Sequence, residues 1–234
     1  MLPPETGSLW LRLEKEPALA GAILVGGTAL ALRIGHRRSY DLDFCFRAHR
    51  LPGRQIEGVI ESLAATGISA QRSDDPTAYD EFLNTGMSLH DYQQAFLTST
   101  DVKLTFFVED PDVAALLHEG LPGGPRLASI EEIFQLKALL SAKRSASRDW
   151  FDLHVLMNYH GFTVGQFADA FHRAGRDHSL DIAFNRLCSG RTAPDDPGFE
   201  AVSGYQPTIV EMRDYFIAER NRFEIESARK AKER

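Results

Sequence analysis

Residues 22–46 read AILVGGTALALRIGHRRSYDLDFCF, and the order of apolar and polar runs in this stretch predicts the first elements of the fold. The apolar run Ala22–Val25 stops at two glycines, which is typical of a buried strand that ends in a tight turn. Good helix formers follow as far as Gly35, and Thr28 is placed to cap this helix. The segment Asp41–Phe46 alternates polar and apolar residues, as a second strand does.

The chain beyond this stretch divides into a mixed half and a helical half. In the mixed half we expect an amphipathic helix over 54–65, a polar loop over 72–90, and strands near 95–98 and 102–108. In the second half the apolar spacing predicts helices over 129–142, 148–159, 164–174, 179–188 and 207–230. The sequence therefore predicts an α+β (mixed α/β) chain, with one domain over 1–125 and a helical domain over 126–234.

Composition and charge exclude several classes of protein. Of the 234 residues, 43% are hydrophobic and 25% are charged, which is ordinary for a globular chain and argues against disorder. The net charge of −7 is unlike that of a basic coat protein for nucleic acid, so any RNA contact needs a local basic patch. Two cysteines cannot build a disulfide framework, and no apolar run reaches the roughly 20 residues that span a bilayer. We therefore expect a cytoplasmic protein.

The clearest candidate for chemistry is the pair Asp41 and Asp43 on the second predicted strand. Side chains alternate across a strand, so both carboxylates face the same side, with Cα atoms about 6.6 Å apart. At that separation both carboxylates can reach one or two divalent cations. A lone pair of this kind is weak evidence, because exposed strands and turns often carry one for no catalytic reason.

The turn Gly26-Gly27-Thr28 strengthens the interpretation. Glycines allow a phosphate to approach the backbone, a helix N-terminus attracts anions, and Thr28 adds a hydroxyl. The alternative is a close-packed turn with a threonine cap. The turn lacks the spacing of a P-loop and the third glycine of the dinucleotide fingerprint, so neither of those sites is predicted.

A second group of charged residues lies in the helical half, at Lys137, Asp149 and Asp152. Lys137 borders the apolar stripe of its helix, and the two aspartates share a face of the next one. Lys137 could bind phosphate while Asp149 orients a base, a sugar or Lys137 itself. The alternative is that the Lys137 ammonium reaches solvent and that Lys137→Met leaves stability nearly unchanged. The aspartates would then only favour the positive end of a helix dipole or pair with arginine at the surface.

Two stretches together resemble a known family. Residues 24–44, with LVGGTALAL followed by HRRSYDLDF, resemble the first motif of the AbiEii/AbiGii nucleotidyltransferase toxin family. Residues 128–153, with a lysine at 137 and the closing run RDWFDL, resemble that family's later motif. Both motifs occur in order over about 22–157, whereas 160–234 match nothing in the family pattern.

The resemblance implies a nucleotidyltransferase fold, in which a small mixed sheet flanked by helices precedes a helical region that completes the nucleotide cleft. It implies transfer of a nucleoside monophosphate from an NTP to a hydroxyl of RNA (tRNA in some members) or protein, with Mg²⁺ (or Mn²⁺). Some members are toxins of toxin–antitoxin or phage-abortive systems, so a cognate antitoxin is an expected partner. The implied catalytic residues are Asp41, Asp43, Lys137 and Asp149, with Asp41 and Asp43 as metal ligands. The implied nucleotide-binding residues are Gly26, Gly27, Thr28, Arg37, Ser39, Lys137 and Arg148.

One departure from the family pattern leaves an alternative open. Nucleotidyltransferases usually carry a third carboxylate on a neighbouring strand, where it helps to deprotonate the acceptor. Here Thr105 holds the central position of the expected strand. Asp101 or Glu109 could substitute, Asp41 and Asp43 could suffice with water, or the protein could be a nucleotide-binding regulator with a degraded site. The preferred base, the acceptor and the oligomeric state stay open.

An RNA acceptor would also require basic residues around the site, because the net charge opposes RNA. The candidates are Arg37, Arg38, Arg47, Arg50, Arg54, Lys143, Arg144 and Arg148. If these residues bind RNA, transfer to RNA should weaken steeply as salt is added.

Overall fold

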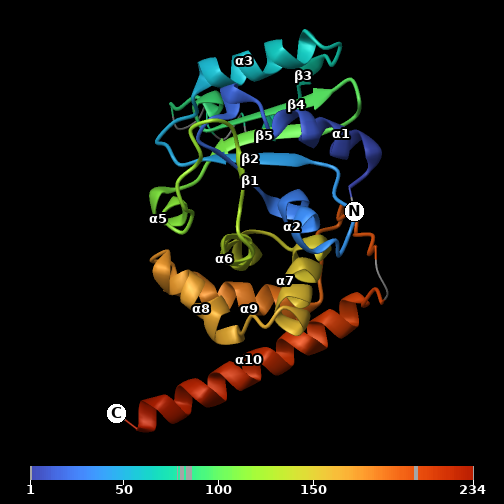
Figure 1. The fold of residues 1–234 in the computed structure, drawn as a ribbon. Coiled ribbons are helices and arrows are strands. Elements are labelled where there is room, and N and C mark those ends of the chain that lie inside the picture. The colour runs from blue at the N-terminus through green and yellow to red at the C-terminus, as the bar shows by residue number, and fades with distance from the viewer. Residues whose placement is uncertain (1, 78, 80–81, 83–85, 203–204, 234) are drawn as a thin grey trace. The chain divides into compact units, whose positions relative to one another are not determined.

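The structure is a computed structural model that describes residues 2–77, 79, 82, 86–202 and 205–233 (Figure 1). The chain forms two compact units, residues 1–129 and 130–234. The first unit contains the sheet, and the second is helical. Among the described residues, no helix has both the length and the apolar composition needed to cross a membrane.

The first unit is built on a six-stranded mixed sheet with the order β3-β4-β5-β2-β1-β6 (Figure 1). Its strands are β1 (Ala22–Val25), β2 (Leu42–Phe46), β3 (Ala70–Arg72), β4 (Gln93–Thr98), β5 (Lys103–Val108) and β6 (Arg126–Leu127). Strand β2 is antiparallel to β1 and parallel to β5, so the two strands of the opening motif are direct neighbours. The predicted mixed α/β class is confirmed.

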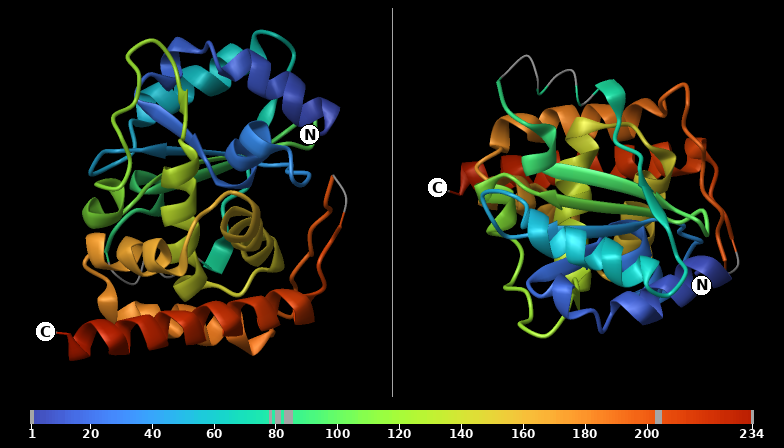
Figure 2. Two further views of the ribbon diagram at one scale, coloured as in Figure 1. Left: turned by 60° about the horizontal axis from the view of Figure 1, so that its bottom comes forward. Right: turned by 90° about the horizontal axis from the view of Figure 1, so that it is seen from above.

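Helices cover both faces of this sheet. Figures 1 and 2 show α1 (Pro4–Leu13) and α3 (Gly53–Ala64) on one face and α2 (Gly26–Ile34) on the other. On the α1 face, the ring of Phe44 stacks between Trp10 and Phe106, with centroids 6.5 and 5.6 Å away. The face that carries Leu42 and Phe44 is therefore core, and the aspartates at 41 and 43 belong to the opposite face.

The local assignments hold with specific exceptions. The helix predicted over 54–65 and the strands predicted near 95–98 and 102–108 are present within about two residues. Strand β3, strand β6 and the short α5 (Pro111–Ala114) lack a clear sequence signal. Residues 78, 80–81 and 83–85 of the predicted loop lie outside the described residues. The predicted cap was wrong, because α2 begins two residues earlier, at Gly26, with Val25 as its N-cap residue.

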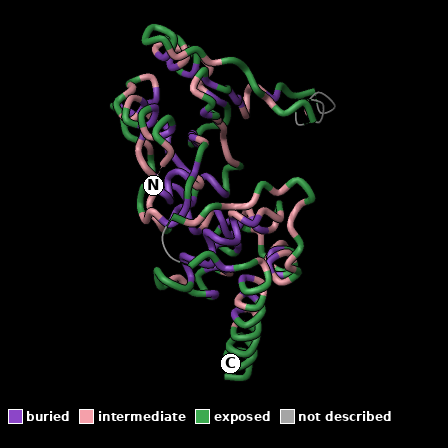
Figure 3. The backbone as a smooth tube through the Cα atoms, turned by 90° about the vertical axis from the view of Figure 1, so that its right-hand side faces the viewer, coloured by how far each residue is buried: buried purple, intermediate pink, exposed green. Residues whose placement is uncertain are grey.

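The second unit contains all five predicted helices, with ends within two residues of those expected. They are α6 (Ile130–Lys143), α7 (Ser147–Tyr159), α8 (Val164–Arg173), α9 (Leu180–Ser189) and α10 (Ile209–Lys232). Two of them begin with capping boxes, Thr163 with Gln166 and Thr208 with Glu211, which satisfy backbone N–H groups at both helix starts. The last turns of α10, residues 224–233, are exposed (Figure 3).

The side chain of His154 is buried between α7 and the start of α10. Its ring meets Tyr215 edge-to-face at 4.8 Å and Tyr159 at 6.2 Å, and its Nδ1 makes no hydrogen bond among the described residues. Burial lowers the pKa of His154 below its ordinary value of 6.5, and the Glu211 carboxylate opposes that shift. The folded chain therefore holds a neutral imidazole at this position.

This burial predicts a loss of stability on acidification. The unfolded chain binds a proton at His154 more readily than the folded chain does, so stability falls as pH drops below about 6.5 towards the lower pKa of the folded state. Thermal melts from pH 7.5 down to 5.0 should show a steeper decline for the wild type than for His154→Leu, which has no proton to gain. Parallel declines would show that His154 does not cause the pH dependence.

Candidate active site

The turn between β1 and α2 lies directly against the carboxylate of Asp43. Val25, the last residue of β1, pairs with Asp43 across the antiparallel ladder. Gly26 has a φ of +74°, and a Cβ at that position would lie 2.8 Å from Oδ2 of Asp43. A side chain at 26 would therefore suffer both a strained backbone and a collision with the carboxylate.

Gly27 is in similarly close contact with two more of the motif residues. A Cβ at Gly27 would overlap the guanidinium of Arg37 and would lie 2.9 Å from Oγ of Ser39. Arg37 is only 4% exposed, and its Nη1 donates to the carbonyl oxygen of Arg38 at 2.9 Å. The local structure thus gathers Asp43, Arg37 and Ser39 around two consecutive glycines.

Thr28 has a different role from the one its sequence position suggested. Its Oγ1 donates to the carbonyl oxygen of Asp41. A hydroxyl has one hydrogen, so this bond uses the donor that was expected to face a phosphate. Thr28 instead ties the first turn of α2 to the backbone of the first aspartate. Among the described residues no side chain caps α2, so its first backbone N–H groups lack a helical partner.

Asp41 and Asp43 offer oxygen ligands of the kind that Mg²⁺ prefers. Both are half-buried and accessible from the same face of the sheet. Within the part of the chain that the structure describes, no three or more His, Cys, Asp or Glu side chains are placed to hold an ion together. The two carboxylates therefore fit a hard divalent cation whose remaining ligands are water or substrate oxygens, as magnesium sites usually are.

The neighbour of Asp43 on β5 is Thr105, which is its direct partner in the parallel register. Asp101 lies in the turn before β5 with a φ of 58°, and Glu109 follows the end of β5. Each is four residues from Thr105, which is about 13 Å along a strand. Neither carboxylate neighbours Asp43, so the position beside the second aspartate is neutral.

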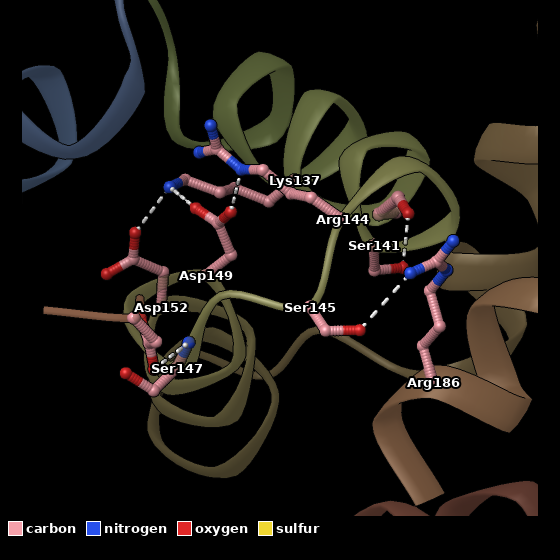
Figure 4. A network of polar contacts seen from close by, with 10 residues as sticks. Lys137, Ser141, Arg144, Ser145, Ser147, Asp149, Asp152 and Arg186 are labelled. Carbon is pink, nitrogen blue, oxygen red and sulfur yellow. Dashed lines mark hydrogen bonds and ion pairs between the residues drawn. The ribbon is translucent and has the colours of Figure 1, made fainter. Parts of the chain in front are cut away.

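Lys137, Asp149 and Asp152 form a buried ion cluster in the second unit (Figure 4). The Nζ of Lys137 lies 2.5 Å from Oδ1 of Asp149 and 2.7 Å from Oδ2 of Asp152. The Nε of Arg144 donates to Oδ2 of Asp149 at 2.7 Å. Lys137 is 4% exposed and both aspartates are 0% exposed. The alternatives of a solvent-reaching lysine and surface-paired aspartates were therefore wrong.

The cluster keeps its charges. Burial by itself would raise the pKa of Asp149, but the Lys137 ammonium and the Arg144 guanidinium outweigh it and hold that pKa below its ordinary value. Asp149 is therefore an anion at neutral pH, and it orients the Lys137 ammonium together with Asp152. The structure thus brings Lys137 and Asp149 together as the sequence suggested, with Asp152 and Arg144 as two further members.

Comparison with known proteins places this geometry in a family. The model of the family described as "Nucleotidyl transferase AbiEii toxin, Type IV TA system" matches residues 8–225. The chain belongs to this AbiEii family. The resemblance in the two motifs is therefore confirmed, and the match extends well beyond them at both ends.

Relatives outside that family model give consistent results. A curated protein of Aquifex aeolicus (strain VF5), itself uncharacterized, is 26% identical over 196 residues, which cover 82% of this chain and 83% of that protein. The crystal structure of JHP933 from Helicobacter pylori matches with a TM-score of 0.51 and 19% identity over 100% of both chains. A second H. pylori crystal structure, described as a candidate nucleotidyltransferase, has a TM-score of 0.50 and 18% identity over 94% of this chain and 95% of that one. These two structures show that the fold is shared.

Several arginines expected to bind RNA in this AbiEii-family chain have acidic partners instead. Nη1 of Arg47 lies 2.5 Å from Glu119, and Nη1 of Arg50 lies 3.0 Å from Asp91. Arg144 pairs with Asp149, as described above. The basic patch inferred from the sequence is therefore weaker than a count of arginines suggests, whereas Arg148 is half-buried in the first turn of α7.

Asp196 is a structural contributor that the sequence did not reveal. The backbone N–H of Ser147, the first residue of α7, donates to Oδ2 of Asp196 at 3.2 Å. The N–H of Ala193 donates to the carbonyl oxygen of Ser145 at 2.9 Å, which joins the same loop to the α6–α7 connection. Asp196 thus caps the helix that carries Asp149. A cap contributed from about 50 residues away has no local signature, although the run Asp195-Asp196 in a Pro/Gly-rich loop was visible.

The ion cluster predicts unequal effects for two lysines of α6. Lys137→Met leaves two buried carboxylates without their shared ammonium and should cost about 3–5 kcal/mol of unfolding free energy. Lys143→Met, which changes an exposed lysine in the last turn of the same helix, should stay within about 0.5 kcal/mol. Urea unfolding of both variants measures the difference.

A double variant tests the physical cause. Adding Asp149→Asn to Lys137→Met removes one uncompensated charge, so the pair should be more stable than the sum of the single losses predicts. Additive losses, or equal losses for the two lysines, would contradict an ion cluster that stabilises the helical unit.

Proposed function

We propose that this chain is a metal-dependent nucleotidyltransferase that moves a nucleoside monophosphate from an NTP to a hydroxyl of RNA or protein. Pyrophosphate is the product released. We further propose that the reaction is that of a toxin in the bacterial cytoplasm, with a cognate antitoxin as its partner. Membership in a toxin family supports the class of reaction, and the geometry of the first unit supports its dependence on NTP and metal.

The observation that carries the proposal is the gathering of Asp43, Arg37 and Ser39 around Gly26 and Gly27. A carboxylate that could hold a cation, an arginine, a hydroxyl and an uncapped helix start lie within one turn of the chain. Phosphoryl transfer needs this combination, because positioning and charge neutralisation provide almost all of its catalysis.

The residues divide this work as follows. The backbone N–H groups at the start of α2 donate to phosphate oxygens, and the two glycines let those oxygens come close. Arg37 adds positive charge behind the turn, and Thr28 holds the backbone of Asp41 in place. Asp41 and Asp43 would hold Mg²⁺ or Mn²⁺, which when bound neutralises phosphate charge and polarises the attacking hydroxyl.

Lys137 and Asp149 remain predicted catalytic residues, and Arg148 remains a predicted nucleotide-binding residue. Within its own unit, Asp149 orients the Lys137 ammonium, so a role for Lys137 at phosphate requires that Asp149 and Asp152 present it rather than neutralise it completely. The prediction that the helical domain completes the nucleotide cleft stands as part of this proposal.

The register of β2 and β5 favours a second candidate function. Because Thr105 is the partner of Asp43, the position that would supply a base for the acceptor is neutral. A protein with this site could bind NTP and metal as a regulator without efficient transfer. Calorimetry with NTP and Mg²⁺, followed by a transfer assay with radiolabelled NTP, distinguishes the two functions: binding without transfer supports the regulator.

Replacement of Asp41 tests the metal site. Asp41→Asn should weaken Mg²⁺-dependent NTP binding and lower transfer by several orders of magnitude, since one ligand of a phosphoryl-transfer metal contributes several kcal/mol. Calorimetry in the presence and absence of Mg²⁺ reports the binding, and thermal melting reports the fold.

Asp101→Asn is the matched control. Asparagine tolerates the left-handed backbone at this exposed position, so the fold should persist. If Asp101 is not a substitute for the third carboxylate, the variant should transfer nucleotide at the parental rate. Loss of activity in Asp101→Asn, or full activity in Asp41→Asn, would contradict the assignment of the metal site to Asp41 and Asp43.

A further inference from the structure

Strand β5 presents a lysine beside the two aspartates. Thr105 pairs with Asp43 in the parallel ladder, so their side chains share one face of the sheet. Lys103 is two residues before Thr105 and is therefore on that same face. It is exposed, whereas Thr105 is half-buried. The face that carries the candidate metal ligands thus also carries a lysine.

The register places Lys103 next to Asp41. Leu42 pairs with Leu104, so one step back along these two parallel strands brings Asp41 and Lys103 level. Neighbouring strands are roughly 4.8 Å apart, which a lysine side chain spans easily. Yet the Lys103 ammonium forms no hydrogen bond or ion pair with any of the described residues. Its charge is available to a ligand held at the aspartates.

The usual structural reason for an exposed lysine on a strand does not apply to Lys103. Lysines often protect the edge of a sheet from pairing with another chain. Strand β5 is not an edge strand, because it lies between β4 and β2 in the order β3-β4-β5-β2-β1-β6. The direct partner of Lys103 on β4 is Leu97, which is 43% exposed and offers no charge.

The sheet order also assigns a side of the site to Lys103. The glycine turn extends from β1, on one side of Asp43, and β5 lies on the other side (Figure 1). In phosphoryl transfer the attacking and leaving oxygens lie in line on opposite sides of the transferred phosphorus. If the turn holds the phosphates that leave, the acceptor approaches over β5. There the chain supplies a neutral Thr105 and a positive Lys103.

We propose that Lys103 binds a substrate phosphate group beside Asp41 and Asp43, on the β5 side of the site. The inference rests on the proposed function and adds a binding residue to it. The phosphate comes either from the NTP or from the nucleotide next to the attacking hydroxyl of a nucleic-acid acceptor. Thr105 permits this contact, because a carboxylate in its place would repel the phosphate.

The test compares Lys103→Met with Lys15→Met and Lys103→Arg. Lys15 is an exposed lysine of the same unit, in the turn after α1, the helix on the opposite face of the sheet. Calorimetry measures the affinity of each protein for the four ribonucleoside triphosphates with Mg²⁺. Fluorescence anisotropy measures the affinity for a short single-stranded oligoribonucleotide at several salt concentrations. Thermal melting verifies that each variant is folded.

We expect Lys103→Met to weaken one of these affinities about tenfold or more, as loss of a charge-assisted contact does, and Lys103→Arg to restore most of it. Weaker NTP binding identifies the nucleotide as the source of the phosphate. Weaker oligonucleotide binding, with a salt slope smaller by about 0.7, identifies the acceptor.

Two outcomes would overturn the proposal, and they are distinguishable. If the wild type binds NTP or oligonucleotide and Lys103→Met binds both as tightly as Lys15→Met does, Lys103 is not a phosphate ligand and the proposed function is unaffected. If the wild type binds neither ligand, the proposed function fails together with this inference.

Discussion

The antiparallel pairing of β1 with β2 determines the geometry of the first unit, because it sets Val25 opposite Asp43 at the point where the chain turns into α2. A slip of one residue would exchange the two faces of β2, burying the aspartates and exposing Phe44. The stacking of Phe44 between Trp10 and Phe106 opposes that slip. The same apolar contacts that stabilise the core therefore keep the carboxylate of Asp43 at the glycine turn.

The second unit obeys a harsher form of the same constraint, since its charged groups are buried rather than merely oriented. Lys137 is stable inside only because two carboxylates share its ammonium, and Asp149 in turn receives a second donor from Arg144. Burial of one such ion alone would be far more costly than any packing gain around it. A buried cluster with a fixed geometry is stiff, which is useful where a charge must be presented in one direction.

The sequence predicts much of this where the signals are local. The apolar run at 22–25, the glycines after it and the alternation of Asp41–Phe46 each report their own structure, and the helices of the second half follow from apolar spacing. Contacts between distant residues have no such signal. The hydroxyl of Thr28 binds a residue 13 positions away instead of capping its own helix. The burial of Lys137 depends on α7, and its position at the border of an apolar stripe is equally compatible with solvent. Thr105 is the instructive intermediate case: periodicity placed it at the centre of its strand, and the register then made it the partner of Asp43.

The hydrogen bond from Thr28 to Asp41 has a consequence for how ligands would influence each other. Thr28 lies in the first turn of α2, where an anion would bind, and Asp41 carries one of the carboxylates that a cation would use. Any adjustment of the helix start towards an anion is transmitted through this bond to the backbone of Asp41. The two binding events then share a coupling free energy, and such coupling is reciprocal: whatever factor the cation adds to the affinity for the anion, the anion adds to the affinity for the cation. A single side-chain hydroxyl would thus make the site cooperative, filling as a pair rather than by halves.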